Sequence, residues 1–451
     1  MADGFPDRAG FSDADSQGIA MASTTGDGFA EDASGNGGAE TVGGKAAPNT
    51  TLDALNFFLA DVRDGLGPYL AIYLLAVRGP AHGWNEATVG MILTIAGIVG
   101  LISQTPAGGL IDRGKNKPRI VMIAALLVTL SSISLPIVTG FTAVAVTQSI
   151  AAIAGAVFAP AISAITLGLV GPKLFAKRVG RNEAFNHAGN AVSAALAGVL
   201  AWKFGPVVVF WLMGALTVAS IVTASRIDNS DIDNAVARGL DCEPEDGCEE
   251  PSGWKTLIEN RPLMIFAVTA FLFHLANAAM LTSVSQLLSR TVGKDQATSL
   301  TAACIVAAQL VMVPVAIVVG RNTEKWGTKP LFLVAFGFLA ARGALYTVSD
   351  NPWWLVGVQA LDGVGAGIFG ALFPVVIADL TKGTGRFNVS QGAVASAQGL
   401  GAALSATLAG AIIVWSGYTT SFLTLATIAG VGLALYVIAM PETKESANTA
   451  A

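Results

Sequence analysis

The chain has 451 residues, of which 53% are hydrophobic and only 13% are charged. An ordinary soluble domain carries roughly 25% charged residues, so this composition excludes a water-soluble globular protein. The net charge of −5 is unevenly spread: residues 1–50 and 228–259 hold 18 of the 31 acids, which leaves the rest of the chain with 22 bases against 13 acids.

Apolar segments follow one another along the chain after a polar start. Residues 1–51 are acidic, rich in Gly, Ala and Ser, and predict a disordered cytosolic tail. Crossing a bilayer as a helix takes roughly 18 to 20 apolar residues. The expected spans are 52–77, 86–109, 118–138, 142–170, 183–203, 206–225, 262–288, 296–319, 330–347, 353–380, 390–415 and 419–440.

Two polar segments complete this division of the chain. Residues 227–261 form an acidic cytosolic linker loop between the sixth and seventh spans, and residues 442–451 form a cytosolic tail. We therefore predict an all-α polytopic membrane protein with twelve transmembrane helices in two pseudo-symmetric six-helix bundles, residues 52–226 and 262–441.

The positions of Lys and Arg predict how the helices are oriented. With a cytosolic N-terminus, the loops on the same side carry Arg113, Lys115, Lys117, Arg119, Lys173, Lys177, Arg178, Arg181, Arg321, Lys325, Lys329, Lys382 and Arg386. The opposite loops carry only Arg78, Lys203, Arg290, Lys294 and Arg342. Because basic residues are retained on the cytosolic side, we expect a multi-pass protein of the cell (inner) membrane with both termini in the cytosol.

An internal repeat relates the two halves. Its first copy, after the second span, consists of Gly108, Asp112, Arg113, Lys117 and Pro118. Its second copy, 212 positions later, consists of Gly320, Glu324, Lys325, Lys329 and Pro330, with Gly327 inside it. Internal repeats in a hydrophobic chain are typical of secondary transporters.

These loops resemble those of the major facilitator superfamily. The resemblance covers roughly residues 52–445 and includes the closing Pro441-Glu442-Thr443-Lys444. It implies a gating role, in which Asp112 binds the start of helix 11 and Glu324 the start of helix 5, because a helix N-terminus attracts negative charge. The alternative is that these loops only anchor the helices by positive charge.

Charged residues inside the first span predict a proton or substrate site. Asp61 and Asp64 share one helix face, and Arg63 points away from them. A charge near the bilayer midplane costs about 2.5 to 3.5 kcal/mol, so its retention needs a reason. The functional interpretation is a carboxylate that takes up and releases a proton; the alternative is a structural ion pair.

Polar residues in three further spans are candidates for the same cavity. Asp362 is the one acid well inside the second half, and it serves as a proton site, a partner for a cationic substrate, or a partner of Arg342. His187 with Asn190, and His274 with Asn277, place polar groups at helical spacing in the fifth and seventh spans. Their alternative role is hydrogen bonding between helices.

The sequence therefore predicts a secondary active transporter of a small organic solute that works by alternating access. No nucleotide-binding loop or hydrolytic triad is found, so we expect no enzymatic activity and no cofactor, and the spacing of Cys242 and Cys248 matches no metal site. The proton is the expected coupling ion, with sodium as the alternative.

The direction of transport and the partners are also predicted. Gly180 and Gly189 fit part of an antiporter pattern of the family and favour export slightly, although Ser193 interrupts it. Import by the same fold is one alternative, and a non-transporting membrane sensor or scaffold is another. The expected partners are a small-molecule substrate and the lipid bilayer, with no nucleic acid, and the protein is expected to be a monomer.

Overall fold

The structure is a computed structural model that describes residues 49–64, 70, 73–74, 86–204, 207–240, 258–292 and 294–443. Most of the predicted N-terminal tail, residues 241–257 of the linker loop with Cys242 and Cys248, and residues 444–451 lie outside the described residues. All regular structure in the described part is helical.

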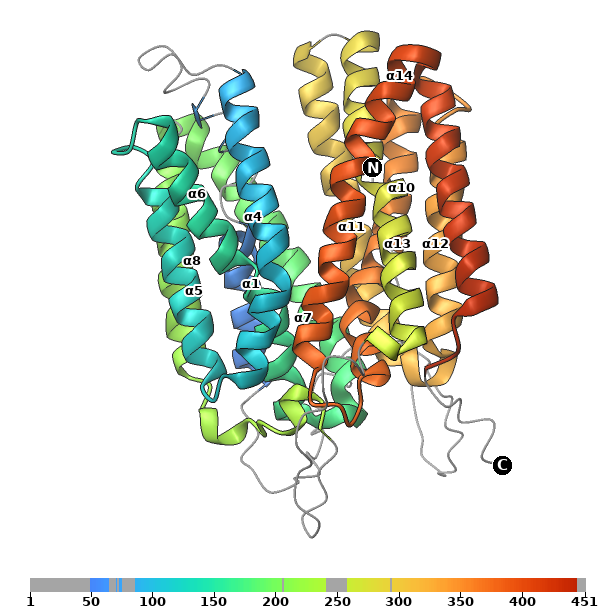
Figure 1. Cartoon of the computed structure of the whole chain (residues 1–451). Helices are drawn as coiled ribbons and strands as arrows, with labels where there is room; N and C mark the ends of the chain where they lie inside the picture. The colour runs from blue at the N-terminus through green and yellow to red at the C-terminus, as the bar shows by residue number, and fades with distance from the viewer. Residues whose placement is uncertain are drawn as a thin grey trace, which may run out of the picture. The chain divides into compact units, whose positions relative to one another are not determined.

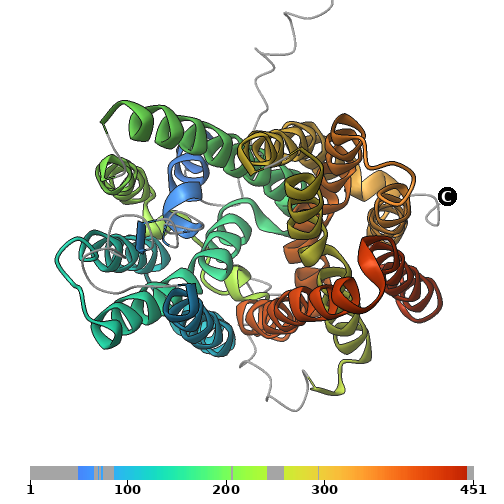
Figure 2. The same ribbon diagram turned by 90° about the horizontal axis from the view of Figure 1, so that it is seen from above.

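The two halves of the sequence form two groups of helices (Figures 1 and 2). The first group consists of α1 (Asn49–Asp64), α4 (Glu86–Arg113), α5 (Lys117–Ile133), α6 (Phe141–Gly155), α7 (Phe158–Phe204) and α8 (Val208–Ser225). The second group consists of α10 (Arg261–Val292), α11 (Lys294–Trp326), α12 (Thr328–Leu345), α13 (Pro352–Leu380) and α14 (Phe387–Ala439). The buried apolar side chains form two clusters, one within the first group and one that joins the second group to part of α7.

α7 and α14 are each bent at a glycine, and each of them continues from one membrane crossing into the next. Gly171 in α7 has φ 70° and ψ 172°, and Gly417 in α14 has φ 83° and ψ 175°. Glycine has no Cβ and adopts a positive φ without strain, so the chain turns there and continues as a new helix. α6 and the first part of α7 together form the fourth crossing.

The described helices account for the predicted crossings. Eight helical stretches are long and apolar enough to cross a membrane, and two of them, Phe141–Ala201 and Phe387–Ala439, contain the bends and span it twice. α5 has 17 residues and the described part of α1 has 16, which is just short of a full crossing. Counted in this way, ten crossings lie in the described part of the chain, and α1 and α5 stand where the first and third crossings are predicted.

The fifth crossing differs from the prediction. Its helix begins at Pro172, directly after Gly171, whereas the expected span starts at residue 183. The bases Lys173 to Arg181, which we expected in a loop, therefore lie on α7. A buried ion pair of Arg178, described below, lets a charged segment continue the helix.

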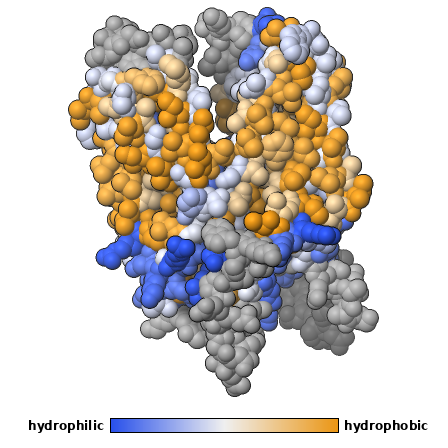
Figure 3. All heavy atoms as spheres, viewed as in Figure 1, coloured by the Kyte–Doolittle hydropathy of each residue, from blue (hydrophilic) through white to orange (hydrophobic). Residues whose placement is uncertain are grey.

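One end of the helices is rich in basic residues, and we call it the basic end. It comprises the segments 113–119, 173–181, 321–329 and 382–386. In Figure 3 hydrophilic residues gather at the lower end of the visible face, below a broad hydrophobic band. Arg342 departs from the expected charge distribution, because it is 1% exposed and lies within α12 instead of a loop at the opposite end.

The chain that follows α8 is folded against the basic end. Residues 228–240, here called the strap, contain the 3₁₀ helices η3 (Asn229–Asp231) and η4 (Val236–Arg238). Ile232, Ala237 and Leu240 are at most 5% exposed. The first part of the segment predicted as an acidic linker loop is therefore packed against the bundles.

Hydrogen bonds tie the strap to both groups of helices. On the first group, Asn229 Nδ2 donates to Lys115 O at 2.8 Å, Lys117 Nζ donates to Asn234 Oδ1 at 2.7 Å, and Asp233 N donates to Gly168 O at 3.1 Å. On the second group, Gly383 N donates to Gly239 O at 2.7 Å and Asn388 Nδ2 donates to Ala237 O at 3.0 Å.

Candidate functional site

The two groups of helices meet at the basic end through Asp112. Its Oδ1 accepts from Asn388 N at 3.2 Å and from Asn388 Nδ2 at 2.8 Å, and its Oδ2 accepts from Val389 N at 2.9 Å. These N–H groups belong to the first turn of α14, where the helix dipole favours a negative charge. Gly108 makes this possible, because a Cβ there would overlap the backbone of Asn388. The predicted contact of Asp112 with helix 11 is present.

The bases of the first loop have different roles. Arg113 is exposed, whereas Lys117 is 0% exposed and donates to Gly114 O at 3.1 Å as well as to Asn234 of the strap. Lys117 therefore holds the strap beside the loop.

The second copy of the loop motif does not repeat the Asp112 contact. Glu324 and Lys325 are exposed, and Glu324 has no hydrogen bond or ion pair within the described residues. The predicted contact of Glu324 with helix 5 is therefore not found in this structure. The start of the next helix, α12, is capped by Glu442. Its carboxylate accepts from Thr328 N at 2.9 Å and from Lys329 N at 3.0 Å, directly after Gly327, which has φ 79°.

The early start of the fifth crossing explains this asymmetry. α11 and α7 touch where a Cβ on Gly320 would lie 2.7 Å from Gly180 Cα. From there the helix start at Pro172 lies about 12 Å further along α7, whereas Glu324 lies about 6 Å further along α11, at 1.5 Å per residue. The carboxylate therefore falls short of the N–H groups that it was expected to cap.

A cavity of about 380 Å³ lies between the two groups of helices. Its polar lining residues are Arg63, Gln104, Ser163, Glu183, Gln391 and Gln398. The visible face in Figure 3 is hollowed between the two groups, above the basic end. The volume lies within the roughly 300 to 1,000 Å³ of pockets for small molecules.

Of the charged residues predicted in the first span, Arg63 reaches this cavity. Asp61 is partly buried on α1 and is not among the lining residues. The side chain of Asp64 lies outside the described part of the structure.

Glu183 is a cavity residue that the sequence analysis missed. His187 Nε2 lies 4.0 Å from Glu183 Oε2, and Asn186 Nδ2 donates to the same oxygen at 3.4 Å. His187 Nδ1 forms a hydrogen bond of 2.9 Å with Gln309 Oε1, so this predicted residue links α7 to α11 of the other group. Asn190 is partly buried one turn further along α7.

The remaining predicted residues lie inside the second group. Asp362 forms an ion pair with Arg342, which also donates to Asn277 Oδ1, and Gln359 Nε2 donates to Asp362 Oδ2 at 3.1 Å. The Arg342 side chain is 2% exposed and that of Asp362 17%. The pairing of Asp362 with Arg342, one of the three roles considered, is present.

His274 forms its hydrogen bond within its own helix. Its Nδ1 lies 3.0 Å from Ala270 O of its own helix, and its ring packs edge-on against Phe369 at 4.7 Å between ring centroids. Because Phe369 lines the cavity, His274 supports the cavity wall.

A second buried ion pair joins the first and fifth crossings. Asp53 Oδ1 accepts from Arg178 Nη2 at 2.7 Å and Asp53 Oδ2 accepts from Arg181 Nη2 at 2.6 Å. The Asp53 and Arg178 side chains are 6% and 5% exposed, whereas that of Arg181 is 51% exposed. The sequence analysis missed Asp53 because it stands among the polar residues that begin the first span.

We expect Asp53→Ala to destabilise the protein by about 3 to 5 kcal/mol, the usual effect of removing one partner of a buried ion pair. The substitution leaves the Arg178 guanidinium buried without the carboxylate beside it. Thermal unfolding of the purified protein measures the effect. Arg181→Ala is the matched control, because that side chain is half exposed and its loss should lower the melting temperature little; equal effects of the two variants would contradict this account.

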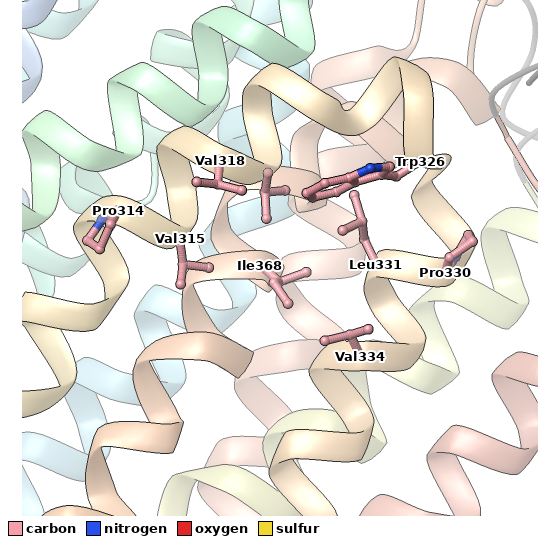
Figure 4. Close-up of a pocket in the computed structure, with 9 residues that line it drawn as sticks. Pro314, Val315, Val318, Trp326, Pro330, Leu331, Val334 and Ile368 are labelled. Atoms are coloured by element: carbon pink, nitrogen blue, oxygen red, sulfur yellow. The ribbon is translucent and has the colours of Figure 1, made fainter. Parts of the chain in front are cut away.

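A groove of about 440 Å³ lies on the surface of the second group (Figure 4). Its lining residues are Pro314, Val315, Val318, Val319, Trp326, Pro330, Leu331, Val334 and Ile368. All of them except the indole N–H are apolar, so the groove offers no group that selects a charged solute. The central cavity is therefore the better candidate for a substrate site.

Comparisons with known proteins agree with the membrane fold described above. The sequence matches the Major Facilitator Superfamily over residues 52–349 and 268–451. It is 52% identical over 395 residues to an uncharacterized MFS-type transporter of Mycobacterium tuberculosis, which covers 88% of this chain and 93% of the relative.

Solved structures share the fold. The human organic anion transporter TETRAN has 15% identity and a TM-score of 0.64, covering 87% of this chain and 98% of its own. The proton:xylose symporter XylE, bound to 6-bromo-6-deoxy-D-glucose, has 13% identity and a TM-score of 0.68, covering 88% and 96%. FucP in the outward conformation has 15% identity and a TM-score of 0.67, covering 87% and 99%.

These findings confirm the predicted all-helical membrane fold of twelve crossings and the assignment to transporters instead of enzymes. They also imply a small-molecule substrate and a multi-pass position in a membrane. The chain belongs to the Major Facilitator Superfamily of transporters.

Proposed function

We propose that this transporter is a proton-coupled secondary transporter that moves a small organic solute through the central cavity by alternating access. One observation carries the proposal: a cavity lined by charged side chains lies between the two groups of helices, and the groups touch each other at the basic end. We call this contact of Asp112 with the start of α14 the contact region. Arg63 and Glu183 face the cavity, and Asp112 holds the start of α14 at the basic end. A charged side chain inside the membrane costs free energy, so Arg63 and Glu183 are best explained by binding of a solute or an ion in the cavity.

We further propose that the basic end faces the cytosol, as the positive-inside rule predicts. The structure then corresponds to an outward-facing state, with the contact region closed on the cytosolic side. Opening to the cytosol requires Asp112 to leave Asn388 and Val389, and Gly180 to separate from Gly320. Asp112 and its loop are therefore gating residues in this proposal.

Two sets of carboxylates are proposed for proton coupling. Asp362 is held by Arg342, and protonation would cancel its charge and free the guanidinium to change partners. Asp61 and Asp64 lie on α1 close in sequence to Arg63, which lines the cavity. A proton on any of them changes the charge balance beside the solute and so links the two movements. Sodium is the alternative coupling ion.

The test is solute-driven proton movement in proteoliposomes loaded with a pH-sensitive dye. Pools of amino acids, sugars and organic acids are added outside with a pH gradient or a sodium gradient imposed. We expect one pool to move protons with the unmodified protein, and the gradient direction that accelerates flux distinguishes export from import. A sensor or scaffold would move no solute under any gradient.

Asp61→Asn and Asp64→Asn are expected to reduce proton-driven flux of that pool at least ten-fold while leaving exchange of solute without a gradient in place. Neutral asparagine keeps the size of the side chain but cannot exchange a proton at neutral pH. Glu324→Gln is the control, since this carboxylate is exposed at the basic end. Unchanged pH-driven flux in both α1 variants would exclude these carboxylates as the proton site.

A further inference from the structure

We infer that the central cavity binds a zwitterionic solute of the amino-acid type with an apolar side chain, its carboxylate at Arg63 and its ammonium at Glu183. The inference rests on the proposed transport function and names the class of solute.

The charges of the cavity wall are the first argument. Among the described side chains that line the cavity, Arg63 is the one base and Glu183 is the one acid. Arg63 has no ion pair within the described residues, and the imidazole nearest to Glu183 is 4.0 Å away. A solute that displaces water from both groups must replace the lost hydration with a charge of each sign. A solute with one charge would leave the other side chain desolvated and unpaired.

Two unsatisfied acceptors in the cavity lining are the second argument. Gln104 Oε1 on α4 and Gln391 Oε1 on α14 are buried without a hydrogen-bond partner, and both residues line the cavity. Gln391 is 3% exposed, and its Nε2 donates to Ser163 Oγ at 3.1 Å, which leaves its oxygen to accept. Buried polar atoms in native proteins nearly always have a partner. An ammonium has three N–H donors, enough for Glu183 and both amides.

The same acceptors relate binding to movement. Gln104 belongs to the first group of helices and Gln391 to the second, so one ammonium would hold both groups together. A carboxylate at Arg63 engages only the first group.

The apolar wall of the cavity is the third argument. Phe369 and Phe373 line it with their rings 5.5 Å apart, and Ala152, Gly155 and Gly370 add small residues. This surface suits an apolar side chain. A hydrophobic amino acid satisfies the two charges, the two acceptors and the aromatic wall together.

The experiment measures binding to the purified protein by titration calorimetry with a matched charge series. The probes are phenylalanine (zwitterion), phenylalanine amide (cation), N-acetylphenylalanine (anion) and N-acetylphenylalanine amide (neutral), and the same four forms of leucine. We expect the zwitterion of at least one series to bind at least ten-fold more tightly than its three derivatives. Equal or tighter binding of a singly charged or neutral form, or no binding in either series, would overturn the inference.

Two variants assign each charge to its side chain. Arg63→Gln should remove the preference of the zwitterion over the amide and keep its preference over the N-acetyl form, and Glu183→Gln should do the reverse. Arg321→Gln and Glu324→Gln, which change exposed charges at the basic end, are controls and should alter none of the affinities. An equal loss for all four forms in both cavity variants would mean a structural role and would also overturn the assignment.

The outcomes separate this inference from the proposed function. Binding does not require transport, so the expected affinity pattern without any flux in proteoliposomes would contradict the transport proposal alone. Proton-driven flux of sugars or organic acids, with no preference for a zwitterion, would contradict the inference alone.

Discussion

Asp112→Ala is expected to open the basic end. The carboxylate satisfies two backbone N–H groups in the first turn of α14 and one side-chain amide, and it is 7% exposed. Loss of a helix cap costs up to about 2 kcal/mol, which is a shift of about 30-fold in a two-state equilibrium. Because these bonds exist only while the two groups touch, the loss falls on the closed state and favours the state open to the basic end.

The measurement is the labelling rate of a single cysteine at the contact region. Ser390 on α14 is 1% exposed, so a cysteine there is shielded until the groups separate. In a background with Cys242, Cys248 and Cys304 replaced by Ala, Ser390→Cys should react with a membrane-impermeant maleimide roughly ten- to thirty-fold faster when combined with Asp112→Ala.

Glu324→Ala is the matched control for this prediction. It removes the acid at the corresponding place of the second loop copy, which is exposed and has no hydrogen bond in the described residues. The labelling rate should stay within a factor of two of the parent. If Glu324→Ala accelerated labelling as much as Asp112→Ala, the two loops would be acting symmetrically and the structural asymmetry would have no functional meaning.

The second large effect concerns the buried pair Arg342 and Asp362. Arg342→Met is expected to destabilise the protein by about 3 to 5 kcal/mol, because Asp362 then remains in the bundle without its counter-charge. Asp362→Asn should be destabilising as well, since it leaves the guanidinium, 2% exposed, without its carboxylate. Thermal unfolding of the purified variants measures both effects.

A double variant separates stability from coupling. Arg342→Met with Asp362→Leu removes both charges and should recover most of the lost stability, because apolar residues of similar size replace buried ion pairs at little cost. If Asp362 carries the coupled proton, this folded variant still exchanges solute but no longer moves it against a gradient in response to pH. Retained proton-driven accumulation would show that Asp362 is a structural partner of Arg342 only.

The sequence was sufficient for the crossings and for the contact of Asp112 with the start of helix 11. Apolar runs long enough to cross a bilayer indicate the helices independently of tertiary contacts. The repeat that contains Asp112 and Glu324 identified the two corresponding loops. Only the first copy makes the expected contact, since the outcome depends on where α7 begins. Gly171-Pro172 was the local signal for that start, and the charges after it were read as a loop.

Pairings between distant residues could not be read from the sequence. Asp53 and Arg178 are 125 positions apart, and neither residue carries a local sign of the other. Glu183 stands at the first position of the predicted fifth span, directly after the bases, and no local pattern shows that it faces the cavity. The pairing of Asp362 with Arg342 was one of three roles considered for Asp362, although Arg342 itself was assigned to a loop.

In the proposed opening of the basic end, the strap is expected to stay with the first group of helices. Three of its hydrogen bonds go to the first group of helices and two to the second, so separation at the basic end leaves it attached to the first. A fluorescent reporter inserted after Leu240 is therefore expected to move with the first group of helices.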